Sequence, residues 1–337
     1  MPVVWLKFIV SAAAVIFCGY RLCIYGEKIA RIVHIGRGFV GFIFLAAITS
    51  LPELAVSLSA TKIGALDLAL GDLLGSNLFN LTIVAIILLF FVQEKTKIQF
   101  DSMHLISSSF SVLLICLVGI GIAFYSLVNP QTGYSPFFLD AESALIVLTY
   151  LFGAYLIFRS ERAKQRGLPA LDKLRSENKA AVWIRFLSLA VVLVGLSIYL
   201  CLLADQIAQV PIGGRALGGT FVGGLFLAII TSLPEMAVSI SAAKLGFMDM
   251  ALGNIFGSNM FNMLIVPVID LAFGPKVILS CVSNLHLFTV LFVLISTGLV
   301  VAGLSYRSRK KTPALAWDSA AILFVYFAAN LVNFYLR

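Results

Sequence analysis

The chain has 337 residues, of which 61% are hydrophobic and 12% are charged, and its mean hydropathy is +1.03. A soluble domain carries about 25% charged residues, so this composition excludes a soluble globular protein and indicates an integral membrane protein. The formal net charge of +8 does not indicate nucleic-acid binding, because the basic residues lie between the apolar runs, as topology determinants do.

The apolar runs predict an all-α fold with ten membrane-spanning helices. Each run can cross a bilayer core of about 30 Å at about 1.5 Å per residue, whereas a transmembrane barrel would show alternating segments of about ten residues. The first run is longer than the apolar part of a signal peptide, so we interpret it as a span. The expected spans are approximately 3–24, 36–61, 67–92, 102–128, 139–158, 183–203, 216–243, 249–271, 283–304 and 315–336.

Lysine and arginine residues predict the orientation of these spans. The connection from Arg159 to Arg185 holds eight of the 24 basic residues, so the positive-inside rule places it in the cytoplasm. With that orientation, 19 of the 24 basic residues are cytoplasmic. We therefore expect a multi-pass protein of the cell membrane with a cytoplasmic central loop and with both termini outside.

An internal repeat relates the two halves of the chain. A shift of 182 residues aligns Thr49–Asn80 with Thr231–Asn262 without a gap, and 21 of the 32 positions are identical. Each half contains five predicted spans, and an odd number places the second half in the opposite orientation, as in transporters with inverted repeats. The expected parts are a first five-helix repeat, 1–158, with the ion motif 46–80; a short cytoplasmic linker, 159–182; and a second, inverted five-helix repeat, 183–337, with the ion motif 228–262.

Each repeat carries a glutamate inside an apolar run, Glu53 in the first and Glu235 in the second. A carboxylate at the centre of a spanning helix costs about 2.5–3.5 kcal/mol on insertion scales, and such residues mark ion pathways unless they are paired or protonated. The alternative interpretation is therefore that each glutamate is paired with a basic residue or is protonated. The two ion motifs contain basic residues only at Lys62 and Lys244, at helix ends, which favours an ion site.

A proline precedes each glutamate. Pro52 and Pro234 have no N–H and clash with the carbonyl four residues earlier, that of Ile48 or Ile230. Carbonyl groups of residues 46–49 and 228–231 are therefore expected to be partly freed, and a bound cation would satisfy them in lipid. A plain proline kink is the alternative, and the adjoining glutamate and Thr-Ser pair favour the ion site.

The next helix of each repeat supplies a second polar wall. Ser76 and Asn80 are four residues apart and share a helix face, as do Ser258 and Asn262. Small-residue packing is the alternative explanation for these helices. Together the motifs offer carboxylates, amides, hydroxyls and carbonyls, and these oxygen ligands suit Ca²⁺ or Na⁺ rather than zinc or copper. Glycines that allow close helix approach are Gly71, Gly75, Gly253 and Gly257.

The charge of the two glutamates indicates a mechanism. Together they contribute −2, so one Ca²⁺ would neutralise the site and three Na⁺ would leave it at +1. Exchange of three Na⁺ for one Ca²⁺ would then move one net charge in each cycle. Inverted repeats around one site fit alternating access to the two sides of the membrane.

The two motifs read Thr-Ser-Leu-Pro-Glu at 49–53 with Gly-Ser-Asn-Leu-Phe-Asn at 75–80, and Thr-Ser-Leu-Pro-Glu at 231–235 with Gly-Ser-Asn-Met-Phe-Asn at 257–262. They resemble the two α-repeats of the calcium/cation antiporter superfamily, particularly the prokaryotic sodium/calcium exchangers. The resemblance covers essentially the whole chain in span number, and its motifs are highly specific.

The resemblance implies a set of ion ligands. Glu53 and Glu235 would be the central Ca²⁺ ligands, joined by the backbone carbonyls of Thr49 and Thr231. Hydroxyls and two carbonyls would surround flanking Na⁺ sites, and two amides would lie in the middle of the site. These further residues are Ser50, Ser232, Ser76 and Ser258, with the carbonyls of Ala46 and Ala228, and the amides of Asn80 and Asn262.

Three features depart from the resemblance. Family members typically have glycine directly before the Thr-Ser pair, where this chain has Ile48 and Ile230. Some relatives carry an aspartate at one of the paired amide positions, whereas this chain has asparagine at both. Asp72 stands where the second repeat has Asn254, and it is read either as a vestibule carboxylate or as a solvated helix-end residue.

Other polar residues are given structural interpretations. Asp67 and Asp249 are expected to be helix N-caps at equivalent repeat positions. The three histidines, near span ends, are expected to have interface or loop roles, and Asp270 is expected to be interfacial. The five cysteines lie in or near apolar segments without paired metal spacing, so we expect them to contribute to packing.

The leading hypothesis is a secondary antiporter that exchanges Ca²⁺ for Na⁺ at a midplane site. A Ca²⁺/H⁺ antiporter that uses the same two glutamates is the alternative, and the Thr-Ser hydroxyls favour sodium. A cation channel is more remote, because inverted halves fit alternating access better than a pore. We expect no enzymatic activity and no cofactor, with Ca²⁺ and Na⁺ (or H⁺) as transported ions. Inorganic cations and membrane lipid are the expected partners, nucleic acid is not, and the ten helices are expected to work as a monomer.

Overall fold

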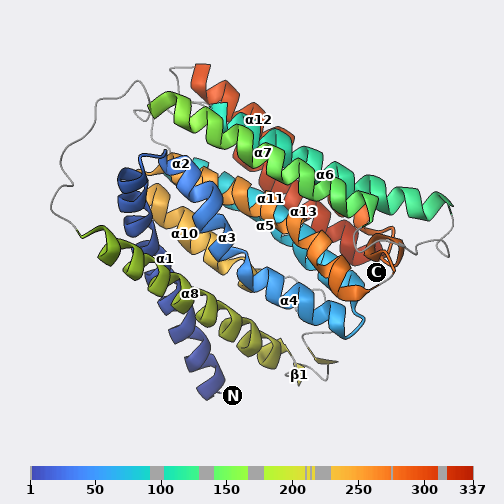
Figure 1. Cartoon of the computed structure of the whole chain (residues 1–337). Coiled ribbons are helices and arrows are strands. Elements are labelled where there is room, and N and C mark those ends of the chain that lie inside the picture. Colours follow the sequence, from blue (N-terminus) through green and yellow to red (C-terminus); the bar gives the residue numbers. More distant parts are fainter. Residues whose placement is uncertain are drawn as a thin grey trace. The chain divides into compact units, whose positions relative to one another are not determined.

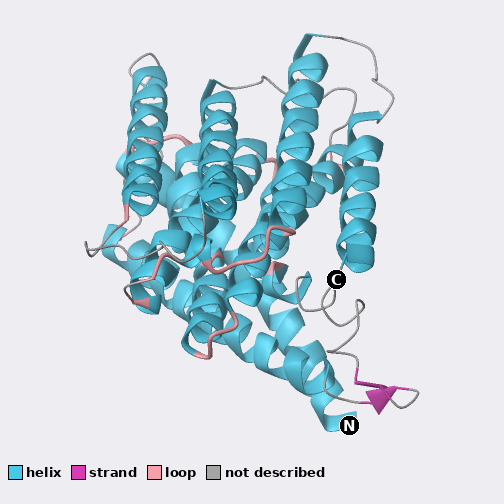
Figure 2. Cartoon of the chain, turned by 90° about the vertical axis from the view of Figure 1, so that its right-hand side faces the viewer, coloured by secondary structure: helices cyan, strands magenta, loops and turns pink. Residues whose placement is uncertain are grey.

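The computed structural model describes residues 2–91, 102–128, 140–165, 178–208, 211–212, 215–216, 229–274, 276–309 and 317–336. These residues are mainly helical, as Figures 1 and 2 show. They also contain one antiparallel pair of two-residue strands, β1 (Pro211–Ile212) and β2 (Arg215–Ala216). The predicted helical membrane protein is confirmed.

Nine helical segments of the described residues are long and apolar enough to cross a membrane. The expected span 216–243 is described continuously only from residue 229 on, so the tenth crossing and the orientation of the termini stay predictions. α7 runs into the predicted linker, whose residues 166–177 lie outside the described residues. The nine segments are α1 (Pro2–Val33), the run Arg37–Lys62, α5 (Leu66–Phe90), α6 (Ser102–Val128), α7 (Ala141–Gln165), α8 (Lys179–Ala208), α11 (Met248–Phe273), α12 (His286–Arg309) and α13 (Trp317–Leu336).

The chain folds as two compact units that differ from the two sequence repeats. Unit 1 consists of Met1–Pro52 and Phe158–Gly257, and unit 2 consists of Glu53–Ile157 and Ser258–Arg337. Unit 1 therefore contains the early part of each predicted repeat, and unit 2 contains the late part of each. The chain passes from one unit to the other within each of the two ion motifs. The division into five-helix repeats stays a prediction.

In unit 1, α1 and α8 lie side by side, and α1 also packs on α10 (Leu233–Lys244) (Figure 1). Gly19 allows the close approach of α1 to α10, because a Cβ atom there would lie 3.3 Å from atoms of Ala237. Cys23 is fully buried in the same contact, and its Sγ donates to the carbonyl oxygen of Val238 at 3.2 Å. The predicted packing role of the cysteines is confirmed for Cys23.

Glycines bring the second helical segment of unit 1 into backbone contact with α11. The segment consists of α2 (Arg37–Val40), a π-helical stretch η1 (Gly41–Leu45) and α3 (Ala46–Thr49). A Cβ atom on Gly253 would overlap the carbonyl oxygen of Gly38, and one on Gly257 would overlap that of Phe42. The predicted close approach is confirmed at Gly253 and Gly257 and is wrong at Gly75, where a Cβ atom would meet no described atom within 4 Å. The contact at Gly253 and Gly257 holds the segment that ends at Thr49 against α11.

In unit 2, α5 packs against α12 and α13, and α12 also contacts α6. α5 is apolar around most of its circumference and is buried along most of its length, as expected for a core helix. The ring of Phe79 packs on that of Tyr326 in α13, with centroids 5.8 Å apart. These contacts place the polar residues of the α5 motif in the interior of unit 2.

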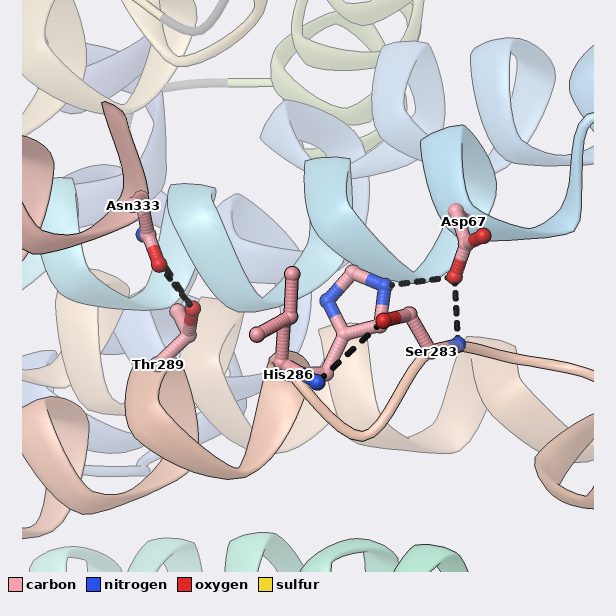
Figure 3. Close-up of polar contacts among 6 residues, drawn as sticks. Asp67, Ser283, His286, Thr289 and Asn333 are labelled. Atoms are coloured by element: carbon pink, nitrogen blue, oxygen red, sulfur yellow. Dashed lines mark hydrogen bonds and ion pairs between the residues drawn. The ribbon is translucent and has the colours of Figure 1, made fainter. Parts of the chain in front are cut away.

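Asp67 joins α5 to the start of α12 (Figure 3). Its Oδ1 accepts a hydrogen bond from the backbone N–H of Ser283 at 2.7 Å and lies 3.0 Å from Nε2 of His286. The N-cap of α5 is Ala65, and Asp67 lies in the first turn. The N-cap prediction for Asp67 is wrong, because its carboxylate satisfies a donor just before another helix instead of one in its own. Asp249 likewise lies within the first turn of α11.

Candidate ion-binding site

Both motifs interrupt a helix at the serine before Leu-Pro-Glu. Ser50 has φ −89° and ψ 4° between α3 and α4 (Leu51–Lys62), and Ser232 has φ −88° and ψ 10° before α10. Pro52 and Pro234 explain the shared break, since neither can donate to the carbonyl four residues earlier. The helix is thus interrupted at equivalent positions of the two repeats.

The carbonyl of Ala46 is not freed by this break. It accepts the backbone N–H of Ser50 at 3.0 Å and the hydroxyl of Thr49 at 3.3 Å. The prediction of a partly freed carbonyl is therefore wrong for Ala46, because the turn at Ser50 keeps two donors within its reach. Whether Ala46 is an ion ligand stays a prediction. Its counterpart Ala228 lies outside the described residues.

In unit 1, a hydrogen bond connects the first motif to the second. Ser50 donates from Oγ to Oε1 of Glu235 at 3.1 Å, although the residues are 185 positions apart. Both side chains are fully buried. A hydrogen bond to a charged group contributes about 1.5–3 kcal/mol, so a hydroxyl donor at this position favours the ionised form of the carboxylate that accepts from it.

Asn254 connects further motif hydroxyls in unit 1. Its Nδ2 donates to Oγ of Ser239 at 2.9 Å, and its Oδ1 lies 3.5 Å from Oγ1 of Thr49. All three side chains are fully buried. This chain of polar contacts fixes the side chain of Thr49, one residue before the helix break.

All predicted ligands that the structure describes are buried. Lys62 and Lys244, the basic residues of the two motifs, are exposed instead. Each lies nine residues from the glutamate of its helix, about 13 Å along the axis. The other predicted ligands with no exposed surface are Glu53, Ser76 and Ser258 in unit 2, and Thr231 and Ser232 in unit 1.

Four asparagines of the two Gly-Ser-Asn-x-Phe-Asn motifs form a hydrogen-bonded network in unit 2, here called the asparagine ring. Asn80 donates from Nδ2 to Oδ1 of Asn259, and Asn262 donates from Nδ2 to Oδ1 of Asn77, each at 3.0 Å. Asn77 and Asn259 donate from Nδ2 to each other's backbone carbonyl, each at 3.3 Å. The 182-residue shift that relates the repeats pairs Asn77 with Asn259 and Asn80 with Asn262, so each bond has an equivalent in the other repeat. The two repeats therefore meet here with local two-fold symmetry.

The side-chain oxygens of Asn80 and Asn262 have a distinct environment. Both Oδ1 atoms are buried and accept no hydrogen bond from the part of the chain that the structure describes. A buried carbonyl left without a donor costs about 1–3 kcal/mol. Amide oxygens are ligands of Ca²⁺ and similar hard cations, so two equivalent oxygens are available for such an ion.

Sequence reasoning missed three residues of these networks. Asn77 and Asn259 belong to the repeated motif, and the repetition itself could have singled them out. Ser239 occupies the same repeat position as Ser57, but nothing local to it indicates a bond to Asn254. Among the described residues, no three His, Cys, Asp or Glu side chains gather closely enough to hold a metal ion.

Ile48, Ile230 and Asp72 are the residues that depart from the family pattern in the two motifs. Ile48 is partly buried in α3, and Ile230 is 6% exposed just before the break at Ser232. Asp72 is partly buried in α5. A vestibule role for Asp72 and an effect of the isoleucines on the site remain predictions.

Comparison with known proteins identifies similar chains. The family described as "Sodium/calcium exchanger protein" matches residues 3–161 and 181–336. The sodium/calcium exchanger MaX1 of Methanosarcina acetivorans is 23% identical over 341 residues, covering 92% of each chain. A protein of Alkalimonas amylolytica described as an antiporter, CaxA, is 30% identical over 291 residues, which cover 82% of this chain and 83% of the relative. The inner membrane protein YrbG of Escherichia coli is 28% identical over 264 residues, 77% of this chain and 76% of the relative.

Solved structures of the sodium-calcium exchanger NCX_Mj have a similar fold. One, soaked with 10 mM Na⁺ and no Ca²⁺, has a TM-score of 0.69 at 20% identity, and the match covers 98% of both chains. Another, of the sodium/calcium exchanger from Methanococcus jannaschii, has a TM-score of 0.66 at 16% identity and covers 98% and 99% of the two chains. At these identities the likeness concerns the fold.

Proposed function

The chain belongs to the sodium/calcium exchanger protein family, and from this we propose that it is a secondary antiporter that exchanges Ca²⁺ for Na⁺ across the cell membrane. Glu53 and Glu235 are the proposed carboxylate ligands of Ca²⁺. The proposed further ligands are Thr49, Thr231, Ser50, Ser232, Ser76, Ser258, Asn80, Asn262, Ala46 and Ala228.

The observation that carries the proposal is the hydrogen bond from Ser50 to Glu235. It brings the hydroxyl of the first helix break to the carboxylate that follows the second. Both groups are fully buried within a chain that belongs to an ion-exchanger family. An ionised carboxylate and a hydroxyl oxygen at a break in a membrane helix form a suitable environment for a partly dehydrated cation.

The proposed ratio of Na⁺ to Ca²⁺ follows from the charge of the two glutamates. Two ionised glutamates contribute −2, so one Ca²⁺ neutralises the site and three Na⁺ bring it to +1. Calcium and sodium then compete for the same oxygens, and the loaded site faces the two sides of the membrane alternately, as inverted repeats allow. In this proposal both termini lie outside, the central loop is cytoplasmic, and a monomer carries out exchange without a cofactor.

The test is ⁴⁵Ca²⁺ uptake into proteoliposomes that contain the purified chain. An outward Na⁺ gradient should accelerate uptake, and Glu53→Gln and Glu235→Gln should each abolish the acceleration. Glu142→Gln is a matched control, because Glu142 accepts the hydroxyl of Tyr125 at 3.3 Å outside the motifs. Normal uptake by either motif variant would show that the carboxylate assignment is incorrect.

The same vesicles separate the alternatives. Uptake driven by an outward H⁺ gradient and indifferent to Na⁺ would replace the sodium proposal with a Ca²⁺/H⁺ antiporter that uses the same glutamates. Uptake that no ion on the opposite side stimulates would indicate a channel. The Ser50 hydroxyl beside Glu235 favours sodium, since proton loading of a carboxylate needs no additional oxygen ligand.

A further inference from the structure

We propose that Asn77 and Asn259 are positioning residues that fix the amide orientation of Asn262 and Asn80, so that these two side chains serve as neutral oxygen ligands. The inference rests on the proposed cation site, and it concerns two residues to which that proposal gives no role. The asparagine ring lies entirely within unit 2.

The orientation of the first two amides is determined by the backbone. Nδ2 of Asn77 lies 3.3 Å from the carbonyl oxygen of Asn259, and Nδ2 of Asn259 lies 3.3 Å from that of Asn77. A backbone carbonyl can only accept, so the atom that meets it must be the amide nitrogen. Rotating either amide by half a turn would place two carbonyl oxygens against each other.

The orientation of the other two amides follows. Oδ1 of Asn77 and Oδ1 of Asn259 can only accept, so Asn262 and Asn80 must present their Nδ2 atoms to them, each at 3.0 Å. The remaining atom of each is Oδ1, which is buried and accepts no hydrogen bond within the described residues. Without the ring either amide could turn and present its N–H groups, which repel a cation.

The ring also keeps positions 80 and 262 uncharged. An ionised aspartate at position 262 would place an acceptor 3.0 Å from Oδ1 of Asn77, and one at position 80 would meet Oδ1 of Asn259 in the same way. Since all four side chains are fully buried, water cannot relieve either contact. Among the proposed ligands, only the two glutamates therefore carry carboxylates.

A double-mutant cycle tests the positioning role. Asn77→Leu removes both side-chain bonds of Asn77, and we expect it to raise the apparent KM for Ca²⁺ about tenfold while kcat changes less than about twofold. In an Asn262→Ala background the same substitution should change KM little, because the amide that it positions is gone. In an Asn80→Ala background the effect should persist, since Asn77 does not bond to the Asn80 side chain.

Asn333→Leu is the matched control. Asn333 exchanges a hydrogen bond with Thr289 between α13 and α12, outside the asparagine ring (Figure 3). The Asn333→Leu variant should have the same KM for Ca²⁺ as the wild-type protein. If Asn77→Leu does not elute as a monodisperse protein in detergent, Asn77→Ser and the repeat-equivalent cycle of Asn259→Leu with Asn80→Ala carry the same expectation.

Two outcomes overturn the positioning role. One is an equal effect of Asn77→Leu with and without Asn262, which would indicate a general packing role. The other is an unchanged KM in Asn77→Leu while Glu53→Gln abolishes exchange, which rejects the positioning role and leaves the proposed function intact. A wild-type protein that neither binds nor exchanges Ca²⁺ overturns the proposed function, and this inference with it.

Discussion

Ser50 donates a hydrogen bond from Oγ to Oε1 of Glu235 at 3.1 Å, and both side chains are fully buried in unit 1. The two residues come from different repeats, and each lies at or just after the point where its helix is broken. The carboxylate of one repeat is thus stabilised by a hydroxyl of the other. The proposed exchange depends on this contact, and several measurable consequences follow from it and from the surrounding packing.

Removal of the Ser50 hydroxyl should weaken exchange. A hydrogen bond to a buried charge contributes about 1.5–3 kcal/mol, so Ser50→Ala should lower kcat/KM for Na⁺-driven Ca²⁺ uptake by about tenfold or more. Initial ⁴⁵Ca²⁺ uptake at several Ca²⁺ concentrations measures this. Ser59→Ala is the control, since Ser59 is exposed on α4 and donates only to the carbonyl of Ala55 at 2.7 Å. Equal rates for the two variants would argue against a role for the Ser50–Glu235 contact.

Exchange should be sensitive to membrane voltage. If three Na⁺ leave a vesicle for each Ca²⁺ that enters, one net positive charge leaves in each cycle, and about 2.3 kcal/mol per 100 mV acts on that charge. A potential that is positive inside should therefore accelerate Ca²⁺ uptake, and a negative one should slow it. Imposed K⁺ gradients with valinomycin provide the measurement. Uptake that is independent of voltage would instead indicate two monovalent ions for each Ca²⁺.

The backbone contact between α2 and α11 should be intolerant of side chains. A Cβ atom on Gly253 would overlap the carbonyl oxygen of Gly38, so Gly253→Ala should destabilise the protein by about 1–3 kcal/mol. Thermal unfolding in detergent, followed by intrinsic fluorescence, should show a lower midpoint. Gly298→Ala in α12 is the control, because a Cβ there meets no described atom within 4 Å. Its midpoint should stay the same or rise, since alanine is the better helix former.

Asp270 should stabilise unit 2 through its two acceptor oxygens. Its carboxylate accepts the N–H of Ile278 at 2.7 Å and the hydroxyl of Ser143 at 3.4 Å, and the residue is 6% exposed. Asp270→Ala leaves the buried N–H without its acceptor and should cost about 1–3 kcal/mol. Asp270→Asn retains one carbonyl acceptor and should cost less. Equal unfolding midpoints for the two variants would contradict this account.

The sequence predicted most of the helical architecture, because long apolar runs are local signals. Nine of the ten expected spans appear as helices of sufficient length and hydropathy in the described residues. The two prolines indicated perturbed helices but not the breaks at Ser50 and Ser232, because a proline can also stand inside a continuous helix, as Pro267 does in α11. Asp67 was wrongly predicted to be an N-cap because its actual partner is not local in the sequence. Its carboxylate accepts the N–H of Ser283, which lies 216 positions away.

The sequence by itself determined that this is a helical membrane protein with two copies of one motif, and that each copy buries a glutamate beside a proline. These properties follow from composition, helix chemistry and internal repetition. Only the tertiary structure decided that Ser50 reaches Glu235 and that four asparagines bond in a ring. Such contacts join residues about 180 positions apart, and their geometry depends on how closely helices pack, which glycines such as Gly253 allow but do not specify.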